Sequence, residues 1–138
     1  MNISKFTQKS VQAVQDLEKV AYEYGNQEVE QEHLLYALLT QEDSLILKLI
    51  EKMDINKEYF INVVKKALDA KVKVSGGDLR FGQYLNKSLV NAENEAKAMG
   101  DEYVSVEHLF LSLLTQPSPG MKKIFSEFGI TRERFLQA

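Results

Sequence analysis

Apolar residues recur at intervals of three and four along most of this chain, which is the spacing of one face of an α-helix. In the first such segment the apolar face is made of Val11, Val14, Leu17 and Ala21. The pattern predicts four helices in the first half of the chain, at about residues 8–24, 31–40, 44–53 and 56–69. No segment shows the alternating pattern of a half-buried strand.

Helix-capping residues support these boundaries. Thr7 stands where an N-cap is expected, and Gly25 follows the end of the first helix. Asn56 is placed to cap the fourth helix. Each predicted helix is short, so it needs packing against its neighbours to be stable.

The second half of the chain repeats the first. A shift of 75 positions aligns residues 6–63 with 81–138 without a gap, and 17 of the 58 aligned pairs are identical. The longest identities are Glu-His-Leu at 32–34 and 107–109, and Leu-Leu-Thr-Gln at 38–41 and 113–116. In the second copy, Ser105 and Thr131 are expected N-caps, and the Pro-Ser-Pro-Gly run at 117–120 is expected to be a turn that restarts the chain near Met121. A repeated structural unit is the simplest explanation.

The repeat predicts an all-α fold, an eight-helix orthogonal bundle made of two pseudo-symmetric four-helix repeats. We expect one domain over residues 1–138, with repeats at about 6–69 and 81–138 and a linker at about 70–80 that contains Gly76 and Gly77. A chain of 138 residues is long enough to bury a substantial core. The last helix has only begun at Ala138, so we expect this chain to be part of a longer protein.

Composition narrows the function classes. The formal net charge is −3 and basic residues do not cluster, which argues against nucleic acid as a partner. The absence of cysteine excludes disulfides and thiolate sites. No apolar run is long enough to span a membrane and the N-terminus lacks the apolar core of a signal peptide, so a cytoplasmic protein is expected.

The sequence offers little catalytic chemistry. It contains no phosphate-binding glycine loop, and His33 and His108 stand alone on their helices. We expect both histidines to form local hydrogen bonds in the first helical turn rather than to share a metal ion. No convincing nucleophile, base and orienting group are evident, so we expect no enzymatic activity, no metal and no cofactor within these residues.

Two segments carry a family resemblance: Gln-Glu-Val-Glu-Gln-Glu-His-Leu-Leu at 27–35, and Gly-Asp-Glu-Tyr-Val-Ser-Val-Glu-His-Leu at 100–109. Together they resemble the doubled signature of Clp N-terminal domains. The opening at residues 6–10 and the spacer at 72–77 resemble the ClpB branch in particular.

The resemblance implies a function that the residues alone do not give. Proteins of the ClpB branch are hexameric AAA+ ATPases that thread aggregated polypeptides through a central pore with an Hsp70 system. Their N-terminal domain binds unfolded segments, while ATP and Mg²⁺ bind in later modules. The isolated domain is expected to be a monomer.

The resemblance also implies substrate contacts at Thr7, Asp101, Glu107 and Glu32. Gly82 departs from the serine or threonine common in the family. An apolar groove would suit unfolded ligands, and we select Phe6, Phe81, Tyr103 and Val106 as candidates for its lining. Each polar candidate also has a structural explanation, since Thr7 can be an N-cap and the glutamates lie in first helical turns, where a carboxylate is favourable.

Two other functions stay open at this stage. One is an adaptor-docking or phosphoarginine-binding domain of a ClpC- or ClpA-type protease unfoldase, because in ClpC relatives the two equivalent glutamates contact guanidinium groups. The other is an enzyme whose site the sequence does not reveal.

Overall fold

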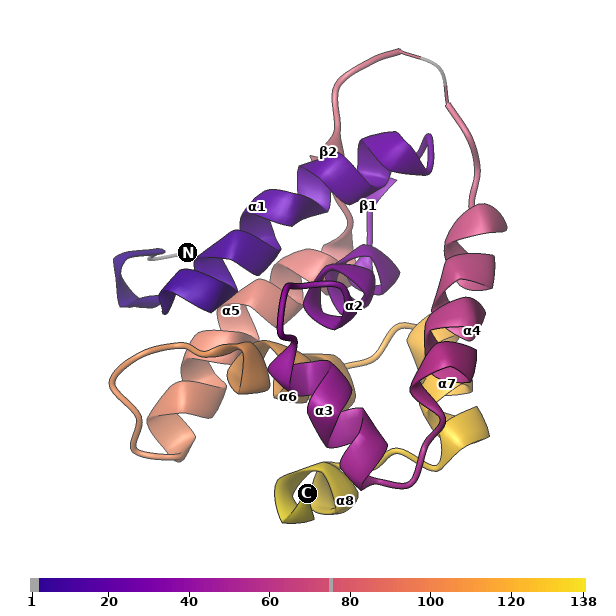
Figure 1. The fold of residues 1–138 in the computed structure, drawn as a ribbon. Helices are drawn as coiled ribbons and strands as arrows, with labels where there is room; N and C mark the ends of the chain where they lie inside the picture. Colours follow the sequence, from indigo (N-terminus) through magenta and orange to yellow (C-terminus); the bar gives the residue numbers. More distant parts are fainter. Residues whose placement is uncertain (1–2, 75) are drawn as a thin grey trace.

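The computed structural model describes residues 3–74 and 76–138, so Ser75 of the expected linker lies outside the described residues. The described chain is built almost entirely from helices, which confirms the all-α bundle (Figure 1). The α-helices of the first half are α1 (Gln8–Glu23), α2 (Gln31–Leu39), α3 (Leu45–Lys52) and α4 (Lys57–Asp69). Those of the second half are α5 (Gln83–Ala98), α6 (Val106–Thr115), α7 (Pro119–Phe128) and α8 (Arg132–Gln137). A short 3-10 turn, η1 (Ile3–Lys5), precedes α1.

The expected caps begin the helices as the sequence indicates. The side chains of Thr7, Asn56 and Thr131 each accept a hydrogen bond from a backbone N–H in the first turn. One boundary differs from the prediction. The helix expected near Met121 begins two residues earlier, at Pro119, because Ser118 is its N-cap and proline suits the first helical position.

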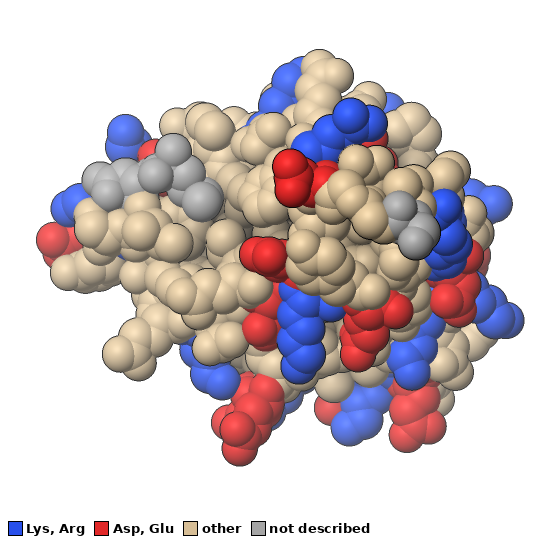
Figure 2. Space-filling model, turned by 90° about the horizontal axis from the view of Figure 1, so that it is seen from above, with Lys and Arg blue, Asp and Glu red and all other residues tan. Residues whose placement is uncertain are grey.

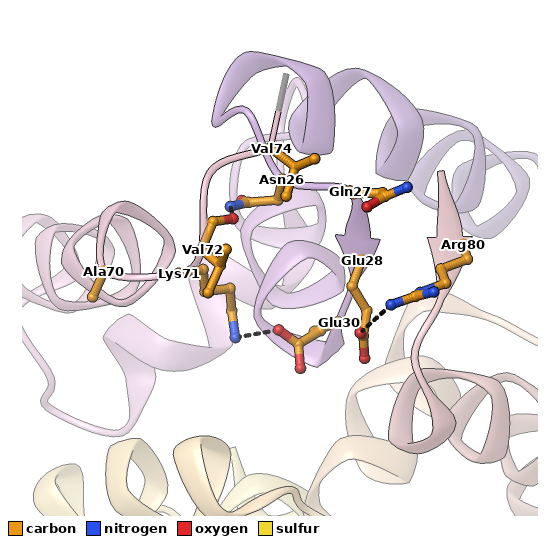
Figure 3. Close-up of a pocket in the computed structure, with 9 residues that line it drawn as sticks. All are labelled: Asn26, Gln27, Glu28, Glu30, Ala70, Lys71, Val72, Val74 and Arg80. Carbon is orange, nitrogen blue, oxygen red and sulfur yellow. Dashed lines mark hydrogen bonds and ion pairs between the residues drawn. The ribbon is translucent and has the colours of Figure 1, made fainter. Parts of the chain in front are cut away.

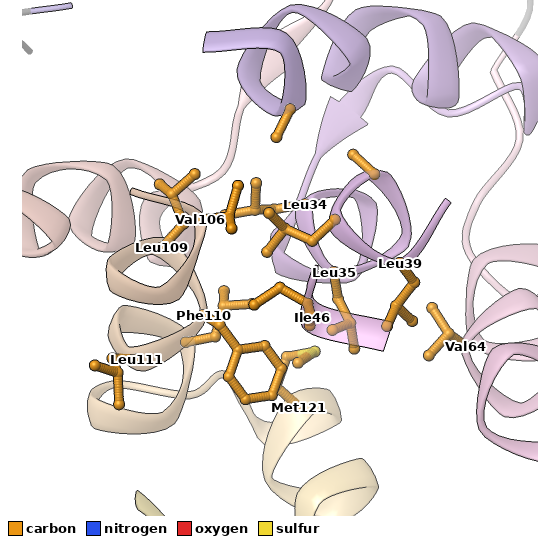
Figure 4. Packing of buried hydrophobic residues seen from close by; sticks show 14 of the residues in the cluster. Leu34, Leu35, Leu39, Ile46, Val64, Val106, Leu109, Phe110, Leu111 and Met121 are labelled. Carbon is orange, nitrogen blue, oxygen red and sulfur yellow. The ribbon is translucent and has the colours of Figure 1, made fainter. Parts of the chain in front are cut away.

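One hydrophobic core serves both repeats. In each repeat the long first helix packs against the short second helix, α1 on α2 and α5 on α6, and the two short helices also contact each other. Figure 4 shows side chains from both halves meeting, among them Leu35 of α2, Ile46 of α3 and Phe110 of α6. All three are fully buried. The stability of either repeat therefore depends on the other.

The backbone joins the two repeats reciprocally. Phe6, just before α1, forms a parallel bridge with Val104, just before α6. Strand β2 (Arg80–Phe81), just before α5, pairs in parallel with strand β1 (Glu28–Val29), just before α2. Since residue 6 corresponds to 81 and residue 29 to 104, these are the same contact made twice. Each repeat thus supplies the entry segment that pairs with the other.

The two short strands are what the sequence pattern missed. Each has two residues, and alternation cannot be recognised over so short a length. The pairing consists of backbone hydrogen bonds, from the Thr7 N–H to the Val104 oxygen at 2.9 Å and from the Gly82 N–H to the Val29 oxygen at 2.8 Å. Such bonds make little demand on side-chain type.

A buried glutamine ties the repeats together at a second point. Gln31, at the start of α2, is fully buried. Its side-chain N–H groups donate to the Ser88 hydroxyl at 2.7 Å and to the Gln116 oxygen at 3.0 Å. Its side-chain oxygen accepts from the Ser118 N–H at 2.8 Å. Val106 is the equivalent residue of the second repeat, so this link exists in one repeat only.

We expect Gln31→Leu to lower the free energy of unfolding by about 2–4 kcal/mol, because it leaves several buried polar groups without partners. Urea unfolding followed by circular dichroism measures this loss. Gln12→Leu is the matched control, because Gln12 is exposed and, among the described residues, its side chain bonds only to Asp16 on its own helix; its effect should stay within about 0.5 kcal/mol. Equal effects of the two changes would contradict the role of Gln31.

Candidate functional site

The reciprocal pairing creates two related seams, and the candidate residues divide between them. The first seam is the Phe6–Val104 bridge with the residues around it. It places Thr7, whose N–H bonds to Val104, near Asp101 and Glu107, which lie three residues before and after Val104. The second seam is the β1–β2 pair, and it holds Phe81, Gly82 and Glu32 in the equivalent places. Thr7, Asp101 and Glu107 therefore lie at the first seam, and Glu32 and Phe81 lie at the second.

Thr7 is a helix cap in the structure. Its hydroxyl accepts from the Ser10 N–H at 3.3 Å and lies 3.0 Å from the Ser10 hydroxyl. Ser10 in turn donates to the Val104 oxygen at 2.7 Å across the seam. Thr7 is half-buried, so part of it still faces the surface. At the second seam Gly82 has no side chain to cap α5.

The two histidines occupy identical local networks, as the sequence predicted. His33 Nδ1 accepts from the Glu30 N–H at 2.8 Å, and His33 Nε2 meets the Asn26 side-chain oxygen at 2.9 Å. His108 Nδ1 accepts from the Ser105 N–H at 2.9 Å, and its Nε2 meets an Asp101 carboxylate oxygen at 2.8 Å. Each imidazole thus fastens the loop before a helix to the first turn of that helix.

The second network has the composition of a hydrolase triad. The Ser105 hydroxyl lies 3.0 Å from His108 Nδ1, and Asp101 holds the opposite nitrogen. The first repeat builds the same arrangement with Glu30 and Asn26, which are neither nucleophile nor acid partner in such a triad. Because the geometry persists without the catalytic residue types, helix capping accounts for it.

Glu32 is enclosed by the protein. It is 5% exposed, and its carboxylate lies 3.3 Å from the Lys71 ammonium. Lys71 comes from the segment after α4 and also binds Glu30 at 2.7 Å (Figure 3). Burial alone would lower the pKa of Lys71, but the hydrogen bond to Glu30 and the charge of Glu32 outweigh it and raise that pKa. A Cβ atom at Gly120 would lie 2.6 Å from the other Glu32 oxygen, so the carboxylate fills the space that glycine leaves at the start of α7.

Glu107 has a different environment from Glu32. It is half-buried in the first turn of α6. Within residues 3–74 and 76–138, no side chain forms an ion pair with it. Two glutamates at equivalent sequence positions therefore differ in what they can bind: Glu32 already holds a cation, and Glu107 does not.

The aromatic and apolar candidates also divide. Phe6 is 7% exposed and Val106 is buried, so both belong to the core. Phe81 is 38% exposed and Tyr103 is 50% exposed, and these two present apolar surface beside the seams. Phe6 offers little area to a ligand, because its ring packs under the first seam.

The surface itself shows mixed charge. In the face drawn in Figure 2, acidic and basic side chains alternate without a large region of one sign. Among the described residues, no cluster of His, Asp and Glu side chains could hold a metal ion. No helix in the described ranges is long and apolar enough to cross a bilayer.

The fold defines the class of protein: an all-helical domain built from two copies of one unit. Its two seams have the same backbone pairing and different side chains. The model of the Clp repeat (R) N-terminal domain matches residues 5–128, and the chain belongs to this family.

Several relatives of the chain are chaperones named ClpB. The chain is 40% identical over 142 residues to a Chaperone protein ClpB of Nitratidesulfovibrio vulgaris and 39% identical over 141 residues to one of Clostridium tetani. Each match covers 99% of this chain and 16% of the relative, so the chain spans about one sixth of their length.

Solved structures share the fold. The N-terminal domain of Hsp104 from Candida albicans has a TM-score of 0.83 at 20% identity, over 96% of this chain and 87% of that one. A ClpV N-domain in complex with a VipB peptide has a TM-score of 0.73 at 22% identity, over 95% of this chain and 82% of that one.

We expect His33 to stay neutral well below the ordinary histidine range. Burial, and then the charge of Lys71, lower its pKa to about 4. The unfolded chain takes up this proton near pH 6.5, so stability from His33 is complete above about pH 6.5 and is lost as the pH falls toward 4. The loss is of the order of 3 kcal/mol for a shift of this size.

Imidazole chemical shifts recorded against pH by NMR measure this directly. A midpoint near 6.5 for His33 in the folded domain would contradict the prediction. The free energy of unfolding, measured against pH, is the second test. Between pH 6.5 and 4 it should fall less steeply in His33→Asn than in the unaltered domain.

Proposed function

We propose that this domain is the substrate-recognition domain of an ATP-dependent protein disaggregase. It binds unfolded or aggregated polypeptide segments and passes them to an AAA+ ring formed by other parts of a longer protein. Family membership and the ClpB relatives support this class. The ClpV N-domain of the same fold, solved with a VipB peptide, supports polypeptide as the kind of ligand.

The observation that carries the proposal is the first seam. There Glu107 offers a carboxylate with no ion-pair partner in the described chain, and Tyr103 exposes half of its surface one residue before the bridge. Exposed apolar area attracts unfolded segments at about 25 cal/mol per Å² buried, without requiring a particular sequence. A carboxylate beside it favours segments that carry lysine or arginine.

Weak, general binding suits this task. An unfolded segment loses conformational entropy when it is held, so its affinity per unit area is low. In this proposal, selectivity comes from a few positions such as Asp101 and Glu107. Low affinity also permits release to the next step.

The rest of the assembly belongs to the same proposal. The longer protein is a homohexamer that works with an Hsp70 system in the cytoplasm. ATP and Mg²⁺ bind outside this chain, and residues 1–138 form one domain, a monomer in isolation, with repeats at about 6–69 and 81–138. Neither catalysis, nucleic acid nor membrane binding is part of its role.

Lys71 weighs against a phosphoarginine ligand shared between the two glutamates. Its ammonium already occupies the place beside Glu32 and Glu30 where a guanidinium would bind. At the other end of such a site Gly82 supplies no hydroxyl. Binding of a guanidinium to Glu32 would require Lys71 to leave the buried Glu32 and the half-buried Glu30.

We expect Glu107→Gln to weaken binding of an unfolded polypeptide by about two- to fivefold, since a partly exposed charge contact contributes up to about 1 kcal/mol. The melting temperature should change by no more than a few degrees. Reduced and carboxyamidomethylated lysozyme, a basic unfolded chain, is a suitable ligand, and NMR titration of the labelled domain measures its Kd.

Glu32→Gln is the matched control. It should leave binding unchanged and lower the melting temperature, because Lys71 loses a buried partner. If Glu107→Gln binds the ligand with unchanged affinity, the Glu107 carboxylate is not part of the binding site. No binding by the unaltered domain at millimolar ligand would refute the proposed function.

A further inference from the structure

The linker between the repeats lies along the loop that precedes α2. The Val74 N–H donates to the Gly25 oxygen at 2.9 Å, and the Asn26 side-chain N–H donates to the Val72 oxygen at 3.0 Å. Between them, the Lys73 ammonium donates to the Leu68 oxygen at 3.1 Å. Residues 72–74 therefore form an extended segment held on the first repeat, which we call the strap. Figure 3 shows Val72 and Val74 beside Asn26.

The strap helps to cover a hollow of the first repeat. This hollow has a volume of about 230 Å³ and lies between the end of α1 and the loop at 25–27. Val74 and the glycines of the linker form part of its wall. The repeat-one residues that line it include Ala21, Tyr22, Asn26 and Gln27.

The second repeat has an equivalent hollow, which no counterpart of the strap covers within residues 3–74 and 76–138. Its volume is about 320 Å³, and the residues that line it include Ala96, Lys97, Asp101 and Glu102. These four are the partners, 75 positions later, of the four named in the first repeat. We call this hollow the repeat-two hollow. In the described ranges 3–74 and 76–138, no backbone N–H donates to the Gly100 oxygen, which corresponds to the Gly25 oxygen that holds the strap.

Side chains at the repeat-two hollow differ from their partners in charge. The amides of Asn26 and Gln27 are replaced by the carboxylates of Asp101 and Glu102. The hollow is also lined by Glu93 and by the cations Lys5 and Lys97, which leaves a formal charge of −1. Asp101 bonds to His108, and its side chain is still half exposed. The open hollow therefore favours a cation more than the covered one does.

Apolar surface flanks the repeat-two hollow. Met99 is 46% exposed and Tyr103 is 50% exposed, and they stand on either side of the loop at 100–102. Ala96 and Val104 contribute apolar atoms to its lining. The strap has the complementary composition, since its sequence is Val-Lys-Val.

We propose that the repeat-two hollow binds an extended polypeptide segment in which a lysine or arginine stands between apolar residues, in the position that the strap occupies on the first repeat. The backbone N–H of the segment donates to the Gly100 oxygen, and its basic side chain faces Asp101 and Glu102. The inference rests on the proposed function and specifies where and in which form the substrate binds. The strap is the internal example of the backbone contact, while its own lysine lies over the Tyr24 ring and donates to the Leu68 oxygen.

A peptide copied from the linker tests the proposal on this chain. We would titrate the ¹⁵N-labelled domain with the acetylated and amidated sequence of residues 71–77, Lys-Val-Lys-Val-Ser-Gly-Gly. Amide shifts should change at Gly100, Asp101 and Tyr103, while Gly25 and Asn26, already covered, stay unchanged. A peptide with glutamate in place of both lysines should bind at least about threefold more weakly.

Exchange of the loop residues between repeats is the matched experiment. Asp101→Asn with Glu102→Gln gives the second repeat the residues of the first. This double change should weaken binding of the peptide at least about threefold. The fold should tolerate this change, because Asn26 bonds to His33 as Asp101 bonds to His108. Gln27→Glu, which keeps the Asn26 bond to the strap, is the control and should leave the affinity unchanged.

The outcomes separate this inference from the proposed function. If unfolded lysozyme binds but neither ligand shifts residues 99–104, the repeat-two hollow is not the site and the wider function survives. Equal binding of the lysine and glutamate peptides would also overturn the inference. If a longer version of the chain covers the hollow with its own following residues and the peptide no longer binds, the occupant is that segment and not a substrate. Binding of neither ligand would refute both.

Discussion

The backbone pairing between repeats is the constraint on which the rest of the structure depends. Each long helix, α1 or α5, begins at a residue whose N–H is bonded to the other repeat. The start of each central helix, α2 or α6, is set by the partner residue of that bond, Val29 or Val104. Neither repeat can complete its entry loop alone, so the shared core and the two seams form together.

Because backbone groups make this pairing, side chains at the seams are free to differ. Thr7 caps its helix where Gly82 does not, and the fold accepts both. The Glu-His pair illustrates the same division of roles. The histidines keep one hydrogen-bonding pattern in both repeats, while Glu32 and Glu107 do not share an environment. Both repeats keep the backbone pairing and the histidine hydrogen bonds, while the surroundings of the two glutamates differ.

The sequence predicted the elements that local chemistry determines. Caps such as Thr7 and Asn56 and the histidine networks follow from residues within a few positions of each other, and periodicity reports them. The two short strands were not predicted, because a strand of two residues is too short to show an alternation of apolar and polar positions. The burial of Glu32 escaped it too, since Lys71 lies 39 positions away in the sequence and reaches Glu32 only through the fold. The shift of 75 located equivalent residues, but equivalence in sequence does not specify what packs against each one.

Connectivity explains why the two repeats present different surfaces. One linker joins them, and its first residues lie against the first repeat, where Lys71 neutralises Glu32 and the strap covers the loop at 25–27. In the described chain the second repeat has no such neighbour, so its loop at 100–104 keeps carboxylates and apolar surface exposed. The difference between the two surfaces does not require a substitution at every position. A single connecting segment changes both the charge and the accessibility of one repeat. A duplicated domain joined in tandem therefore acquires one stabilised face and one open face, and Asp101 and Glu102 mark the open one.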